Sequence, residues 1–406
     1  MLFLSQELQK IVTFNLNSAR NDTSGCLHTI HFNNAGSSLP PNQVLEATIN
    51  YLKTEARIGG YETALEFSAQ HAKVYQSIAL MINCKLSEVA IVESATRAWD
   101  LALSSITFQE GDRVLTSHSE YISNYLALLQ LKKKLNFKID FIPNDSDGQC
   151  SLEALADMVD EKVKLIAITH VPSTNGLVNP LVGISDIAKS VGALFLLDAC
   201  QSIGQMPIDV EKIGCDFLAA TGRKFLRAPR GSGFLYIRES VLKKYNLEPL
   251  FVDFSSATLN TSGSYTLIET AKRFENFEMS YASRIGLGTA VEYALNIGLE
   301  NIWKRVQAVA QELRDELSEI PQVTLCDSGI IKSGIITFSI DKINPYQFSE
   351  QMRTKKINVS TGKVEFSIDL KERKIDSIVR ASLHYYNSSE EIKKFTEELK
   401  VVCLQS

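Results

Sequence analysis

The sequence predicts an α/β protein with two domains: a large one built on a mostly parallel sheet covered by helices, and a smaller α+β one. Three observations lead to this fold class. Short apolar runs alternate with segments whose apolar residues recur at helical spacing, a pattern typical of a parallel sheet with crossover helices. The pattern changes after about residue 285. The 406 residues also exceed what one compact core usually holds.

The expected strands of the large domain are apolar runs bounded by small or polar residues. Such a run fits a strand that is buried on both faces. In chain order the runs are VAIVES (89–94), RVLTSH (113–118), LIAITH (165–170), LFLLD (194–198), FLAATG (217–222) and GFLYIR (233–238). Helical spacing marks intervening segments at 96–107, 121–135, 151–159 and 183–191.

The last third of the chain has a different order of elements. We expect, in sequence, helices at 286–299 and 301–319, the strand GIITFSI (334–340), a helix near 346–355, the strand RASLHY (380–385) and a closing helix at 388–400. This order indicates a separate α+β unit. We therefore divide the chain into an N-terminal arm (1–30), a large domain (31–280) and a small C-terminal domain (281–406).

Composition excludes several classes of function. Hydrophobic residues make up 45% and charged residues 22%, as in ordinary soluble globular proteins, and the net charge of -5 argues against a nucleic-acid partner. Seven cysteines without a C-x-x-C pair fit a reducing compartment and predict no metal site. The start, MLFLSQELQK, has no long apolar stretch, so we expect a cytoplasmic protein with no signal peptide and no membrane partner.

Two residues indicate the chemistry. Asp198 ends the run LFLLD, which places its carboxylate at the carboxyl end of a strand, where open α/β sheets bind ligands. Lys224 follows in TGRKFLRAPRGSGFLY (221–236), before a glycine-rich hairpin. A carboxylate at that edge can pair with the protonated pyridine nitrogen of pyridoxal phosphate, and a lysine can form a Schiff base with this cofactor. Taken singly, each residue has a plainer explanation, as a helix cap or a solvated charge.

Together the two segments resemble the aminotransferase class V family of fold-type I pyridoxal phosphate enzymes, in which Asp-Ala-x-Gln precedes Ser/Thr-x-x-Lys and a Gly-x-Gly-x-Leu strand. The resemblance covers roughly residues 31 to 400. It implies a large domain with a seven-stranded sheet and pyridoxal 5′-phosphate as the cofactor. Lys224 and Asp198 would be the catalytic residues, and Gln201 would donate to the phenolic oxygen of the cofactor.

The same resemblance assigns further cofactor contacts to Ala95, Thr96, Tyr121, Ser173, Thr221, Arg223 and Ser280. Ala95 and Thr96 would bind the phosphate at a helix start, where the plainer alternative is a simple N-cap. Tyr121 takes the position of a histidine that stacks on the pyridine ring in cysteine desulfurases of the family. Ser173 would touch the ring and its phenolic oxygen.

The substrate side is assigned by three other segments. VRASLHYYN (379–387) resembles the strand whose arginine grips the substrate α-carboxylate, a role that falls to Arg380. Asn34 and Tyr61 would also contact the substrate. In related dimers the Tyr61 loop and a hydroxyl at the Ser280 position reach the neighbouring subunit, so we expect a homodimer with shared active sites. Whether Tyr61 and Ser280 act in cis or across the dimer stays open.

The segment INVSTGKVEFSIDL (357–370) bears on the reaction. Cysteine desulfurases of the family need a nucleophilic cysteine there, and this segment has none. Other segments resemble hercynylcysteine sulfoxide lyases and isopenicillin N epimerase-like proteins more closely. They are GGY (59–61), THVPSTNG (169–176), TGRKFLRAPRGSGFLY (221–236) and RASLHYYN (380–387). We therefore expect an enzyme that binds an α-amino acid as a Schiff base, removes its Cα proton and eliminates a sulfur group from Cβ. An aminotransferase, an epimerase, a non-catalytic cofactor-binding protein and a disfavoured desulfurase or selenocysteine lyase stay open as alternatives.

Overall fold

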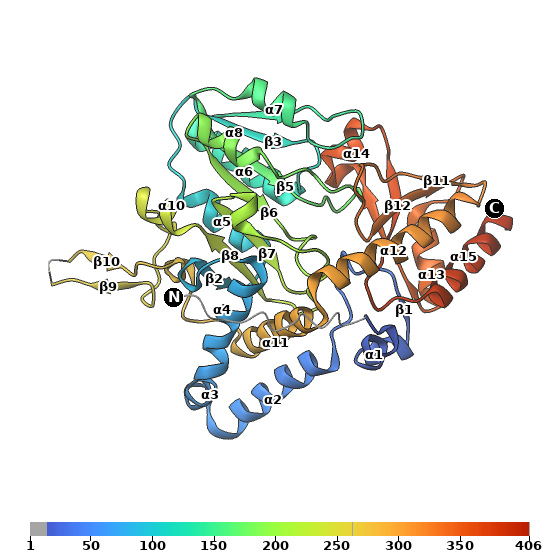
Figure 1. Cartoon of the computed structure of the whole chain (residues 1–406), viewed down its shortest axis with the longest axis horizontal. Helices are drawn as coiled ribbons and strands as arrows, with labels where there is room; N and C mark the ends of the chain where they lie inside the picture. The colour runs from blue at the N-terminus through green and yellow to red at the C-terminus, as the bar shows by residue number, and fades with distance from the viewer. Residues whose placement is uncertain (1–13, 262, 406) are drawn as a thin grey trace, which may run out of the picture.

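The computed structural model describes residues 14–261 and 263–405, and its centre is a seven-stranded sheet (Figure 1). β8 runs antiparallel to both of its neighbours, and the other pairs are parallel. This confirms the predicted fold class. From edge to edge the strands are β2 (Val89–Val92), β8 (Gly233–Ile237), β7 (Phe217–Thr221), β6 (Leu194–Asp198), β5 (Val163–Thr169), β3 (Arg113–Ser117) and β4 (Lys138–Ile142).

Helices cover both faces of this sheet, and each face has its own hydrophobic core. In β6, Leu194 and Leu196 enter one core, while Phe195 and Leu197 enter the other. Because side chains alternate along a strand, Asp198 faces the same side as Leu194 and Leu196. The helices on that side are α5 (Ala95–Ser105), α6 (Ile122–Leu135) and α10 (Glu239–Lys244). Those on the other side are α4 (Ser68–Ile82), α7 (Leu152–Met158), α8 (Ile184–Ser190) and α11 (Tyr281–Ile297).

The chain reverses its path across the sheet at β3. From β3 it moves outward to the edge strand β4, and then β5, β6 and β7 follow one another on the other side of β3. In open α/β sheets, ligands bind at the carboxyl ends of the strands beside such a reversal. The loops that follow β3, β5 and β6 are therefore placed to form a site.

The small domain is built on a four-stranded antiparallel sheet beside the large one (Figure 1). Its strand order is β11 (Val323–Leu325), β12 (Ile335–Ile340), β15 (Ser377–Ser382) and β14 (Ser360–Lys363). Its core lies against α12 (Leu299–Ser318), α13 (Pro345–Thr354) and α15 (Ser389–Leu404). A short strand near the N-terminus, β1 (Ile30–His31), pairs in parallel with β13 (Ile357–Asn358).

Helix α11 begins at residue 281, where the sequence predicted the start of the small domain. Helix α11 packs against α4 and α2 (Asn42–Ile58), which belong to the large domain. α12 begins after Gly298, and its first turns place Ile302 and Val306 in the large-domain core. Only further along do Val309 and Leu313 enter the small-domain core. Helix α12 thus contributes to both cores, and the periodicity of the sequence does not show which core a helix joins.

Several elements were missed, and most of them are short and exposed. β4 carries Lys138 and Asp140 and is only partly buried, so it shows no apolar run. The hairpin of β9 (Ala257–Leu259) and β10 (Tyr265–Leu267) projects from the body of the molecule (Figure 1). The remaining short helices are α3 (Gly60–Glu66), α9 (Val210–Ile213), α14 (Ile368–Glu372) and four 3-10 turns at Ser24–Leu27, Leu86–Glu88, Ala271–Phe274 and Val364–Phe366.

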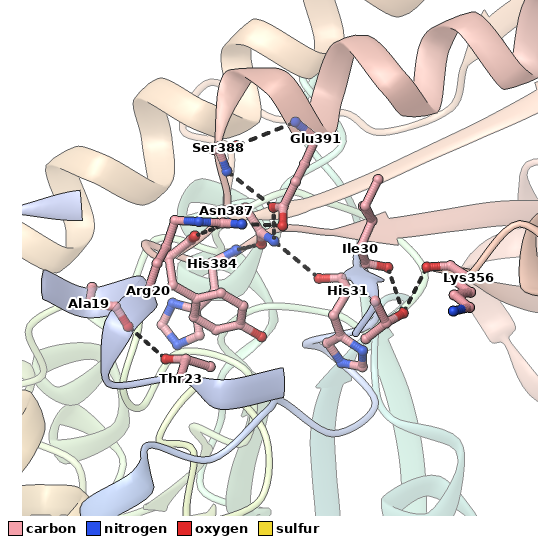
Figure 2. A network of polar contacts seen from close by, with 12 residues as sticks. Ala19, Arg20, Thr23, Ile30, His31, Lys356, His384, Asn387, Ser388 and Glu391 are labelled. Atoms are coloured by element: carbon pink, nitrogen blue, oxygen red, sulfur yellow. Dashed lines mark hydrogen bonds and ion pairs between the residues drawn. The ribbon is translucent and has the colours of Figure 1, made fainter. Parts of the chain in front are cut away.

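The described part of the N-terminal arm packs on the small domain (Figure 2). Arg20, in α1 (Leu16–Asn21), donates to Glu391 at 2.9 Å. Asn387 donates to Glu391 at 2.9 Å and to the carbonyl of His31 at 3.3 Å. These contacts hold the segment that leads into the loop at 31–41 against the start of α15. Within residues 14–261 and 263–405, no helix is long and apolar enough to cross a membrane.

Candidate active site

A cavity of about 310 Å³ opens at the carboxyl ends of β6 and β7, next to the start of α5. The residues around it come from segments that are far apart in the sequence. Seven of the predicted site residues line it, namely Ala95, Thr96, Tyr121, Asp198, Thr221, Arg223 and Lys224. The structure thus brings the predicted lysine, carboxylate and helix N-terminus together.

Asp198 forms part of the cavity wall and is 4% exposed. Its Oδ1 accepts a hydrogen bond from the backbone N–H of Cys200 at 2.8 Å, and its Oδ2 accepts one from Asn124 Nδ2 at 2.8 Å. Burial raises the pKa of Asp198, and the charge of Lys224 opposes that rise. A carboxylate held in this way is oriented to accept a further hydrogen bond from a cationic donor in the cavity.

Lys224 points into the same cavity from the turn after β7. Its Nζ lies 3.4 Å from Cys200 Sγ and 5.8 Å from the centre of the Tyr121 ring. The turn is closed by backbone hydrogen bonds from Arg227 N–H to Lys224 O at 2.9 Å and from Ala228 N–H to Gly222 O at 2.9 Å. The lysine therefore projects from a fixed backbone, which suits a residue that must carry a cofactor.

Arg227 stabilises the turn around Lys224 through hydrogen bonds to other segments of the chain. It has a positive φ of 65°, a conformation that costs energy for a residue with a side chain. Its buried guanidinium donates to the carbonyl of Leu39 at 2.8 Å, to the hydroxyl of Thr23 at 2.6 Å and to the hydroxyl of Tyr385. The Lys224 turn is thus tied to the N-terminal segment and the small domain.

The opposite wall of the cavity suits an anion. α5 begins there with Ser94 as its cap, and the N–H groups of a first helical turn attract negative charge. Arg223 donates to Thr221 Oγ1 at 3.1 Å, and neither Arg223 nor Arg230 pairs with a carboxylate within the described residues. Gly233 allows the backbones of β7 and of the α5 cap to approach closely, because a Cβ at this position would lie 2.5 Å from Ala220 O and 3.2 Å from the carbonyl carbon of Ser94.

These observations test whether pyridoxal 5′-phosphate fits. A phosphate needs donors and positive charge, a protonated ring nitrogen needs a buried carboxylate, and the aldehyde needs an amine. In this cavity the start of α5 and Arg223 supply the donors and the positive charge for the phosphate. Asp198 supplies the buried carboxylate, and Lys224 supplies the amine. The residues present therefore fit this cofactor.

Arg380, on β15, does not itself line this cavity but lies near Tyr121, which does. It donates to the carbonyl of Ser173 at 3.1 Å and to Asn33 Oδ1 at 3.3 Å, and its Nε has no partner within the described residues. Burial lowers its pKa to about 10, while the nearby Tyr121 opposes that change. A half-buried guanidinium that pairs with no carboxylate of the described residues has free donors for an anionic ligand.

Three further predicted residues, Ser173, Gln201 and Asn34, make contacts with other parts of the chain. Ser173 offers its backbone carbonyl to Arg380, and its side chain does not line the cavity. Gln201 donates its amide hydrogen to Ala35 O at 3.2 Å, which anchors the N-terminal loop. Asn34 is fully buried and bonds to Ser382 O, His31 O and the hydroxyl of Tyr386. Among the described residues, its neighbour Asn33 is the asparagine of this loop that accepts from Arg380, at 3.3 Å.

Tyr61 and Ser280 lie elsewhere in this chain. They share a second cavity of about 330 Å³ between α2, α3 and the start of α11. Tyr61 is 77% exposed, and Ser280 caps α11 by accepting from Ser283 N–H at 3.2 Å. Within one chain neither residue lines the cavity that holds Lys224.

Two residues at the site were missed by the sequence analysis. Asn124 lines the cavity, and Glu120 lies buried below it. The signal in the sequence was limited to a glutamate just before the cap of a helix and an asparagine in the first turn of that helix. This pair of residues could be interpreted only once the structure showed that β6 brings Asp198 next to Asn124.

Cysteines are scarce around the site. All seven lie within the described residues and are unpaired, and Cys200 alone lines the cavity. Burial raises the pKa of the Cys200 thiol, and Lys224 opposes that rise. Cys326 is 8% exposed and packs with Leu370 and Ile378 in a small separate core.

The family model for aminotransferase class-V matches residues 30–395. The chain belongs to this family. A protein from Methanothermobacter thermautotrophicus named probable cysteine desulfurase is 30% identical over 380 residues, which is 92% of this chain and 94% of the relative. A probable cysteine desulfurase from Pyrococcus abyssi is 29% identical and covers 93% and 94% of the two chains. The solved cysteine desulfurase of Thermococcus onnurineus has a TM-score of 0.89 at 27% identity, covering 96% of this chain and 98% of its own.

Membership of this family establishes the class of enzyme and its cofactor. The protein is an enzyme of fold type I, and its cofactor is pyridoxal 5′-phosphate. The prediction of family, fold and cofactor is confirmed. The family includes several reaction types, so the reaction of this chain has to be argued from its own residues.

Proposed function

We propose that this class-V enzyme is a lyase that eliminates a sulfur group from Cβ of a cysteine-type amino acid. One observation carries the proposal. The site has an amine, a buried carboxylate and, close by, an arginine that pairs with no carboxylate of the described residues, but the segment 357–370 has no thiol to accept sulfur. The segment forms β13, β14 and the start of α14, and none of these elements contains a cysteine. Elimination needs no such thiol.

Each of the site's residues has a task in this reaction. When bound, the cofactor holds the substrate amine and delocalises the electron pair left at Cα. Arg380 binds the α-carboxylate with its free donors, since a guanidinium fork matches a carboxylate. Lys224 takes the Cα proton as general base. Asp198 accepts a hydrogen bond from the ring nitrogen and keeps that nitrogen protonated.

The overall reaction is balanced without an oxidant. An S-substituted cysteine and water give pyruvate, ammonium and a thiol, and the sulfur leaves with the electron pair of the broken Cβ–S bond. The assay follows pyruvate with lactate dehydrogenase and measures thiol and alanine in parallel. We expect equal amounts of pyruvate and thiol. Alanine as the main product, or a cofactor that stops in its amine form until a 2-oxo acid is added, would overturn the proposal.

A second candidate, cysteine desulfurase, is favoured by the names of the relatives. The thiol it would need is Cys200, which lines the cavity 3.4 Å from Lys224 Nζ. Cys200→Ala separates the two functions, because a lyase keeps most of its pyruvate formation while a desulfurase loses sulfur transfer. Cys326→Ala serves as the control, since that thiol lies in a separate core.

The attachment of the cofactor to Lys224 has its own test. Borohydride reduction of the yellow enzyme followed by peptide mapping should place the label on Lys224. The chain offers a matched control in Lys212, an exposed lysine whose substitution by alanine should leave the labelling unchanged. A label on another lysine would refute the assignment.

We also propose that the working unit is a homodimer. Tyr61 and Ser280 share a cavity that is separate from the one with Lys224, which fits residues that serve a neighbouring subunit. Sedimentation of the loaded enzyme at micromolar concentration should give one species of twice the chain mass. An active monomer that retains the cofactor would contradict this arrangement.

A further inference from the structure

We propose that Glu120 is a positioning residue of this site, whose charged carboxylate acts on the cofactor's ring nitrogen through Asn124 and Asp198. The inference rests on the proposed role of Asp198. It adds a second carboxylate to the site, placed behind the one that faces the cofactor. Neither the family match nor the predicted site residues assign a role to Glu120.

The geometry links the two carboxylates through one amide nitrogen. Asn124 Nδ2 donates to Glu120 Oε1 at 2.8 Å and to Asp198 Oδ2 at 2.8 Å. A side-chain NH₂ group has two hydrogens, so both are used in this bridge. Glu120 and Asp198 are each only 4% exposed. The bridge is therefore buried and fixed at both ends.

Glu120 is surrounded by donors but by no cation. Besides Asn124, it accepts hydrogen bonds from the hydroxyl of Thr116 at 3.0 Å, from the backbone N–H of Tyr121 at 2.8 Å and from the hydroxyl of Thr169. No lysine or arginine within the described residues forms an ion pair with it. Four donors suit a carboxylate in its charged form, which can only accept.

The sequence builds this arrangement from four elements. Glu120 sits in the loop after β3 and one residue before Tyr121, the cap of α6. Asn124 lies in the first turn of α6 and donates to Glu120 from there. Thr116 belongs to β3, Thr169 ends β5, and Asp198 ends the next strand, β6. All of these groups meet at the sheet edge where the chain reverses its path.

The physical consequence concerns charge. In a buried site, a second negative charge raises the affinity of its neighbour for a proton or a cation, because little water screens it. Glu120 thereby strengthens the hold of Asp198 on a protonated ring nitrogen. If Glu120 served only to fasten α6 to β5, its hydrogen bonds would matter and its charge would not.

Glu120→Gln separates these two roles. Glutamine has nearly the same shape and keeps an oxygen that can accept from Asn124, but it carries no charge. The holoenzyme is loaded with ¹⁵N-labelled pyridoxal 5′-phosphate, and the ¹⁵N chemical shift of the ring nitrogen is measured at about pH 8, where carboxylates are usually ionised. We expect the shift to move toward that of a neutral pyridine, and kcat to fall by a factor on the order of 10 with KM nearly unchanged.

Glu275→Gln is the matched control. Glu275 is another buried carboxylate, which accepts from the hydroxyl of Tyr75 at 2.8 Å and from Ile91 N–H at 2.7 Å, and it does not line the cavity. Its substitution should leave the ¹⁵N shift and kcat unchanged. If it moves them as much as Glu120→Gln does, the effect is a general cost of losing a buried carboxylate and the proposal is wrong.

A double-mutant cycle tests the path through Asn124. Asn124→Ala should move the ¹⁵N shift in the same direction as Glu120→Gln, and the double variant should add less than about twofold to the loss in kcat. If Glu120→Gln does not fold, Asn124→Ala cuts the same link from the other side. Full additivity, or an unchanged shift in Asn124→Ala, overturns the proposal.

Asp198→Asn distinguishes this inference from the proposed function on which it rests. If that variant leaves the ring nitrogen protonated, the assigned role of Asp198 fails. If it shifts the nitrogen signal while Glu120→Gln does not, the role of Asp198 stands and only the role of Glu120 fails.

Discussion

Glu120→Gln should also change how the stability of the cofactor-free protein depends on pH. Burial, together with the nearby charge of Asp198, raises the pKa of Glu120 from 4.5 to about 7. The native state therefore keeps a proton on this group at pH values where the unfolded chain has lost it. Within that window, the free energy of unfolding contributed by Glu120 falls as pH rises.

The magnitude follows from the size of the shift. The window runs from 4.5 to about 7, and each pKa unit corresponds to about 1.4 kcal/mol. The free energy of unfolding of the natural chain, relative to that of Glu120→Gln, should thus fall by about 3 kcal/mol between the acid and the alkaline end of the window. The variant has no group to titrate at this position, so the difference between the two proteins isolates Glu120.

Urea unfolding of both cofactor-free proteins at a series of pH values measures this difference. Glu161→Gln is the control for a lost carboxylate, since Glu161 is exposed in the turn before β5. Its difference from the natural chain should be flat across the window. A flat difference for Glu120→Gln would refute the reasoning, because it would mean that Glu120 has the same proton affinity in the native and unfolded chains.

Three further substitutions test the site and its support. Asp198→Asn should keep the fold, as judged by circular dichroism, and lower kcat by a factor on the order of 10² or more, so near-normal turnover would contradict its role. Arg380→Gln should raise KM for amino acids by a factor on the order of 10², and an unchanged KM would show that another group binds the carboxylate. Asp327→Asn should lower the free energy of unfolding by about 3 kcal/mol in urea, because it leaves the buried Arg314, 2.7 Å away, without its counter-charge. A loss below about 1 kcal/mol would show that other groups compensate Arg314 for the missing charge of Asp327.

The chemical residues could be predicted where local sequence carries the signal. The run Leu194 to Leu197 fixes a buried strand, and Asp198 follows it at the edge where ligands bind. The small residues before α5 and the turn around Lys224 are equally local features. For these positions the signal lies within one segment, because each side chain belongs to a strand end, a helix start or a short turn.

Predictions that needed contacts between distant segments were less reliable. Asn33 and Asn34 are adjacent, and the loop pattern does not say which of them faces Arg380 on β15. The edge strand β4 shows no apolar run because Ile142 is the one buried residue among its five. The place of α11 in the large domain likewise depends on its packing against α2 and α4.

The sequence by itself determined the fold class, since this depends on periodicity, and its resemblance to the aminotransferase class V family indicated the cofactor and the residues Lys224 and Asp198. Only the tertiary structure decided that Glu120 and Asn124 stand behind Asp198, and that Tyr61 and Ser280 share a separate cavity. The physical reason is that strand order brings β3, β5 and β6 side by side, and the pattern of any one strand does not encode its neighbours.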